Sequence, residues 1–91
     1  MKVYIVGDSG PEHNMVISIH RTYGGAFKMW NARRLELLKE AKSSLRRNMK
    51  YGKSSCEMWE RMAKSLSCKD PKKIDNYPHD TPYIEEREVS K

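Results

Sequence analysis

The stretch that decides the fold is YGGAFKMWNARRLELLKEAKSSLRRNM, residues 23–49. At about 100° per residue its apolar side chains fall in one narrow arc of a helical wheel, which predicts a long helix with one buried face. Gly52 follows as a typical helix stop. A second stretch with helical spacing then carries Trp59 and Leu66 on one face. Together the two stretches predict a helical hairpin over residues 23–68.

The regions on either side of this hairpin read as strands. Residues 2–6 and 15–21 are rich in β-branched and apolar side chains, and the residues between them are turn formers, which predicts an antiparallel hairpin over residues 2–21. Three prolines favour a surface loop over residues 69–82. The charged run at 83–89 predicts a strand at the edge of a sheet.

These elements predict one small α+β domain over residues 1–91, with the order ββααβ. We expect a three-stranded antiparallel sheet in the order 2-1-3, with the helical hairpin packed on one face. The candidate core residues are Val3 or Tyr4, Ile5, Met15, Ile17, Ile19, Phe27, Trp30, Leu38, Ala41, Leu45, Trp59, Met62 and Leu66.

Charge is distributed unevenly along the chain. The formal net charge is +6, from 18 Lys and Arg against 12 Asp and Glu, and residues 28–53 alone carry +7. Five of these cations share one flank of the predicted helix: Lys28, Lys39, Lys42, Arg46 and Lys50. Such a row suits an anionic partner, either an acidic protein surface or nucleic acid. A solvated helix face with no partner is the third interpretation.

Arg34 differs from the other cations because its wheel position lies within the apolar arc. A guanidinium there needs a partner or must reach outward to water. We expect a structural pair with Glu86 or Glu88 of the last strand. The functional alternative is an arginine that lines a shallow anion pocket.

No pattern in the chain predicts catalysis, a metal site or a cofactor. Gly7-Asp8-Ser9-Gly10-Pro11 is similar to a serine-protease signature, but only seven residues precede Asp8, too few for the upstream histidine and aspartate. The three histidines are not at metal-ligand spacing. The apolar run in residues 3–6 is too short for a signal peptide or a membrane span. We therefore expect a non-enzymatic protein that does not enter membranes.

The two ends and the first helix resemble a group of short phage and prophage accessory proteins. Members of that group open with a Lys-Val-Tyr-x-Val strand and close with an Ile-x-Glu-x-Glu-Val strand. The matching residues here are Lys2, Val3, Tyr4, Val6, Thr22, Tyr23, Ala26, Trp30, Ile84, Glu86, Glu88 and Val89.

This resemblance implies a phage accessory protein that works in the cytoplasm of a host bacterium. It implies no catalytic residues. By analogy, such a protein binds and blocks a host protein or an anti-phage defence protein. The alternative function is a basic regulator that binds nucleic acid through the cationic flank of the long helix.

Overall fold

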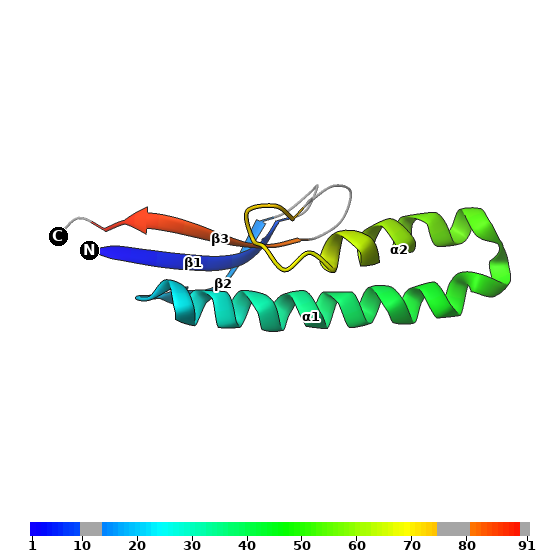
Figure 1. The fold of residues 1–91 in the computed structure, drawn as a ribbon, viewed down its shortest axis with the longest axis horizontal. Helices are drawn as coiled ribbons and strands as arrows, with labels where there is room; N and C mark the ends of the chain where they lie inside the picture. Colours follow the sequence, from blue (N-terminus) through cyan, green and yellow to red (C-terminus); the bar gives the residue numbers. More distant parts are fainter. Residues whose placement is uncertain (10–13, 75–80, 90–91) are drawn as a thin grey trace.

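The computed structural model describes residues 1–9, 14–74 and 81–89 (Figure 1). The elements are β1 (Lys2–Ser9), β2 (Asn14–His20), α1 (Tyr23–Asn48), the short 3₁₀ helix η1 (Met49–Tyr51), α2 (Lys53–Leu66) and β3 (Thr81–Glu88). The predicted α+β class and ββααβ order are confirmed.

β1 lies in the middle of a three-stranded antiparallel sheet, between β2 and β3. This is the predicted 2-1-3 order. The central place suits β1 because residues 3–6 form a continuous run of β-branched and aromatic side chains. β3 carries four charged residues and lies at an edge, where charge discourages pairing with another strand.

β1 is longer at its C-terminal end, and β3 is longer at its N-terminal end, than the sequence predicts. β1 continues through Ser9, where we expected a loop after Val6, and β3 begins at Thr81, where we expected residue 83. The reason is mutual pairing, because Ser9 lies opposite Thr81 in the register. The predicted loop is shortened accordingly, and its residues 75–80 lie outside the described part of the chain.

α1 runs along most of the molecule, which measures 55 × 23 × 19 Å, and the ends of β1 and β3 extend past its first turn (Figure 1). Its first half covers one face of the sheet, and its second half packs against α2. α2 lies beyond the end of the sheet, on the same side of α1 as the strands. Within the helical hairpin, α1 is therefore the helix that covers the sheet.

The buried apolar side chains form two clusters along α1. One joins the sheet to the first half of α1 and contains Val6, Ala26 and Trp30. The other joins the two helices and contains Leu37, Ala41, Met62 and Leu66. Ile74, in the segment after α2, packs against both clusters and so connects them.

The buried face of α1 is rotated from the predicted one. Leu38, Leu45 and Phe27 are half-buried, whereas Leu37 and Ala26 are buried. The rotation arises because α1 packs against two neighbours in turn, the sheet and then α2. Its buried face is set by both neighbours and not by the apolar side chains of α1 alone.

The predicted inward face of β2 is also wrong. Met15 and Ile19 are 53% and 64% exposed, although we placed both in the core. Ser18 lies opposite Val6, which packs on α1, so Ser18 faces the helix and Ile19 faces away. A bulge in the pairing at Val6 and Gly7 shifts the alternation further along the strand.

Candidate binding surface

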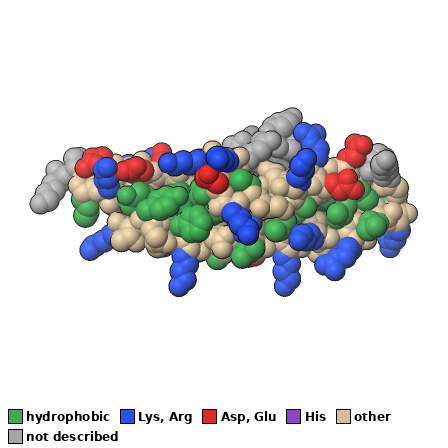
Figure 2. All heavy atoms as spheres, in the orientation of Figure 1, with side chains coloured by type: hydrophobic (Ala, Val, Ile, Leu, Met, Phe, Trp, Pro, Cys, Tyr) green, Lys and Arg blue, Asp and Glu red, His purple; other side chains and the backbone are tan. Residues whose placement is uncertain are grey.

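Four of the five predicted cations lie on the solvent side of α1 and the fifth lies in η1, and each is exposed. We call them the basic row: Lys28, Lys39, Lys42, Arg46 and Lys50. At about 100° per residue, the row is centred about 180° from the buried residues of the helix. Lys and Arg side chains project along the edge of the molecule that α1 forms (Figure 2).

The basic row is held in place by the fold beneath it. Trp30 and Ala41 are fully buried on the opposite side of α1, one in each apolar cluster. At 1.5 Å per residue the row spans about 33 Å from Lys28 to Lys50. Because both clusters anchor the helix, a partner can bind along it without first ordering the backbone.

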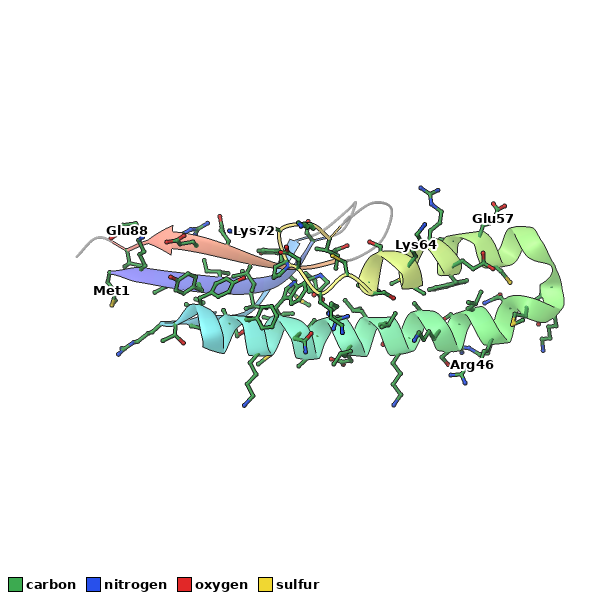
Figure 3. All side chains as sticks on the ribbon, in the orientation of Figure 1. Met1, Arg46, Glu57, Lys64, Lys72 and Glu88 are labelled. Atoms are coloured by element: carbon green, nitrogen blue, oxygen red, sulfur yellow. The ribbon has the colours of Figure 1, made fainter. Side chains whose placement is uncertain are left out.

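No carboxylate neutralises the basic row within the described residues. The ion pairs found there involve other cations, such as Arg33, whose guanidinium contacts Glu36 at 3.5 Å. Lys50 lies 5.2 Å from the centre of the Tyr51 ring. Arg46 lies in the last turn of α1, where a cation also complements the helix dipole. Figure 3 shows Arg46 directed away from α2.

The row contains an apolar interruption. Ala32 and Leu35 occupy the solvent side of α1 between Lys28 and Lys39, and Leu35 is 49% exposed. Beside them, Lys28, Met29 and Ala32 line a shallow hollow of about 350 Å³ together with His20 and Gly25. The surface therefore offers a cationic section over the second half of the helix and an apolar section near its start.

Arg34 is buried, as its wheel position predicts, but its expected carboxylate partner is wrong. Nη1 donates to the carbonyl oxygen of Leu66 at 2.8 Å, and Nε and Nη2 donate to Oδ1 of Asn31 at 3.2 and 2.7 Å. The guanidinium also lies 5.7 Å from the centre of the Trp30 ring. Every nitrogen of the guanidinium thus donates inside the protein, which favours a structural role over an anion pocket.

The expected partners of Arg34 bind other cations instead. Glu86 pairs with Lys2 at 3.1 Å, and Glu88 pairs with the amino group of Met1 at 3.2 Å. The hydrogen bond from Lys2 to Glu86 raises the pKa of the Lys2 ammonium. Glu88 and Met1 lie at the end of the sheet remote from α2 (Figure 3). Arg34 lies instead where α2 ends, and the carbonyls of a helix C-terminus attract a cation.

A partly buried ion pair that the sequence did not predict joins the sheet to α1. Arg33 donates from Nε and Nη2 to Oδ2 of Asp8, at 2.9 and 2.7 Å. The hydrogen bond to Asp8 raises the pKa of the Arg33 guanidinium, against the lowering effect of burial. Oδ1 of Asp8 is buried and has no hydrogen-bond partner among the residues that the structure describes. From the sequence alone, Asp8 is predicted in a loop, because Gly, Asp and Ser are turn formers.

The rejected catalytic and metal motifs can be placed only in part. Gly7, Asp8 and Ser9 belong to β1, while Gly10 and Pro11 lie outside the described residues. The described residues hold no group of three His, Cys, Asp or Glu side chains arranged to bind a metal ion. Neither α1 nor α2, as far as the structure describes them, is long and apolar enough to cross a membrane.

No protein family, curated protein or solved structure matches this chain in sequence or fold comparisons.

Proposed function

We propose that this chain is a non-enzymatic binding protein that attaches to an acidic surface of another protein through the basic row. The observation that carries the proposal is the position of five exposed cations, four on the solvent side of α1 and Lys50 in η1, without ion-pair partners among the described residues. Cations left unpaired on a rigid helix attract an anionic partner over a long range and orient it on approach.

The wider biological role in this proposal is that of a phage accessory protein. Its partner would be a host protein or an anti-phage defence protein, which it blocks by occupying a surface in the bacterial cytoplasm. The resemblance of the two terminal strands and the first helix to short phage proteins supports this role. The small size of the chain also suits a protein that acts by binding one partner.

Charge reversal tests the contribution of the basic row. Replacing Lys39, Lys42, Arg46 and Lys50 with Glu changes the net charge from +6 to −2, since each replacement changes it by two. We expect this variant to lose the partner in affinity capture from bacterial lysate, read by mass spectrometry. Its stability should change little, because a surface substitution usually shifts the free energy of unfolding by no more than about 0.5 kcal/mol.

The chain offers a control with the same net charge. Lys64, Lys69, Lys72 and Lys73 are exposed and lie outside α1, and their replacement with Glu also gives −2. Figure 3 shows Lys64 and Lys72 on the side of the molecule away from Arg46. We expect the control variant to keep the partner. Equal loss in both variants would show that net charge, and not the basic row, controls binding.

The second candidate is a nucleic-acid-binding regulator that uses the same row. It is favoured by the cation spacing, because Lys39, Lys42 and Arg46 follow at intervals of three and four residues and so form one line along the helix. No aromatic side chain interrupts this line, so phosphates and not bases would be contacted. Capture that recovers only nucleic acid would favour this candidate and contradict the first.

A further inference from the structure

The two edges of the sheet differ sharply in chemistry. β3 carries Pro82 and four charged residues, the features by which proteins protect an edge strand. β2 has the sequence NMVISIH, without proline, Lys, Arg, Asp or Glu. Among the described residues, no strand pairs with the outer side of β2. Within the described part of the chain, that edge therefore presents backbone groups with no neighbouring strand, beside mostly apolar side chains.

The exposed apolar residues of β2 are distributed over both faces of the sheet. Val16 lies opposite Gly7 and Ile19 opposite Ile5, and these β1 residues are two apart, so Val16 and Ile19 share the face directed away from α1. They are 55% and 64% exposed. Met15 lies opposite Asp8, whose carboxylate binds Arg33 of α1, so Met15 shares the face of the helix.

We propose that two copies of this chain pair antiparallel along the outer edges of β2, about a two-fold axis between Ile17 and Ser18. This register places Val16 opposite Ile19 of the second copy, and Met15 opposite His20. Both members of each pair lie on the same face of the sheet, as antiparallel pairing requires. The exposed Val16 and Ile19 of both copies are then covered together.

A second copy of this chain is the partner that we infer for the β2 edge, because the charges and the apolar side chains of this segment are compatible with those of an identical segment. A copy related by the two-fold axis meets no charged residue between Met15 and His20, because this segment has none in either chain. The paired sheets form one continuous sheet of both copies, with both α1 helices on the same face. The interface would consist of one pair of strands and is therefore small, so we expect a Kd on the order of micromolar or weaker.

The long-range electrostatics oppose this association, because each copy carries +6. Added salt screens that repulsion, so the dimer should become tighter as the salt concentration rises. Binding of an acidic protein through the basic row has the opposite dependence. The two interactions use different residues, so failure of one leaves the other intact.

Sedimentation equilibrium at increasing protein concentration tests the proposal. We expect a monomer–dimer equilibrium in the unmodified protein. Ile19→Lys places an ammonium opposite Val16 at both symmetric positions and should weaken the dimer at least about tenfold per position. Leu35→Lys is the control, because Leu35 is a comparably exposed apolar residue on α1 and should leave the dimer unchanged.

A compensating variant tests the register itself. The double variant Val16→Glu, Ile19→Lys places a carboxylate opposite an ammonium of the second copy twice, and should recover dimerisation that Ile19→Lys loses. Hydrogen exchange of the unmodified protein gives a measurement that needs no variant, and β2 amides should exchange more slowly as concentration rises. A monomer at every concentration and salt, a dimer insensitive to Ile19→Lys, or no recovery in the double variant would overturn the proposal.

Discussion

Arg34, in the middle of α1, donates a 2.8 Å hydrogen bond to the carbonyl oxygen of Leu66, the last residue of α2. The same guanidinium lies over Trp30, whose indole Nε1 donates to the carbonyl oxygen of Pro82 in β3 at 2.8 Å. One side chain therefore links the end of α2 to the residue that fixes β3 on α1. This junction lies between the two apolar clusters, and its loss should affect both.

Arg34→Ala should destabilise the fold by about 2–4 kcal/mol, because it leaves the Leu66 carbonyl without its donor and opens a cavity beside Trp30. Arg34→Lys should cost less, since an ammonium can still donate but cannot reach both Leu66 and Asn31 with the same geometry. Urea unfolding followed by circular dichroism measures both. Arg46→Ala is the exposed control and should stay within about 0.5 kcal/mol. Equal stability of the Arg34→Ala and Arg46→Ala variants would contradict the linking role.

The pair between Asp8 and Arg33 should behave asymmetrically. Arg33→Ala leaves a buried carboxylate without any hydrogen bond and should cost about 3–5 kcal/mol. Asp8→Ala should cost less, about 1–3 kcal/mol, because the Arg33 side chain is 25% exposed and can turn to water. In a double-mutant cycle, the double variant should lose less than the sum of the two single losses. Additive losses would mean that the two side chains do not interact.

Gly7 and Gly24 should respond in opposite ways to the same substitution. A Cβ at Gly7 would lie 2.6 Å from the carbonyl oxygen of Met15 and 2.5 Å from Oη of Tyr83, so Gly7→Ala must displace β2. We expect a loss of about 1–3 kcal/mol in the free energy of unfolding. A Cβ at Gly24 meets nothing within 4 Å, and Gly24→Ala should gain about 0.5 kcal/mol from helix propensity. Thermal unfolding of both variants checks the signs, and a stabilised Gly7→Ala variant would contradict the close packing of β2 on β1.

Gly52 marks the turn between η1 and α2 with a φ of +104°, a region that side chains with a Cβ rarely adopt. Gly52→Ala should therefore destabilise the helical hairpin by about 1 kcal/mol or more, although the surroundings are open. The comparison with Gly24→Ala separates backbone conformation from packing, because an added Cβ at either site would meet no described residue beyond its immediate chain surroundings within 4 Å. A neutral Gly52→Ala would mean that the turn can adopt a negative φ without cost.

The class, the element order and the strand order followed from periodicity and turn chemistry alone, because those signals are local. Asp8 shows where local signals end. Its neighbours Gly7 and Ser9 favour a turn, but pairing with β3 and the ion pair with Arg33 keep it in β1. Both interactions join residues far apart in the sequence, so composition near Asp8 carried no sign of them.

The predicted buried faces of α1 and of β2 are wrong for a related reason. A helical wheel assigns one buried face to the whole length of α1. In the structure, Trp30 packs against the sheet and Leu37 packs against α2, so the buried face is set by two different neighbours. In β2, the expected alternation is interrupted by a bulge at Ile17, which has no partner in β1, and the apolar Ile19 faces away from α1. The prediction that the cations of the basic row share one exposed side of the helix is confirmed. Lys and Arg residues without a partner are almost always exposed to solvent, however the rest of the helix packs.

Salt dependence separates the proposed interactions in one titration. Binding of duplex DNA through three to five phosphate contacts predicts a slope of about −3 to −5 in log association constant against log salt. An acidic protein should show a weaker dependence that falls mainly on the association rate, because salt screens long-range steering more than close contacts. Replacing Lys39, Lys42, Arg46 and Lys50 with Glu should abolish either slope, while the variant of Lys64, Lys69, Lys72 and Lys73 should retain it. A slope that survives reversal of the row would show that the row is a solvated face and that the partner binds elsewhere on the molecule.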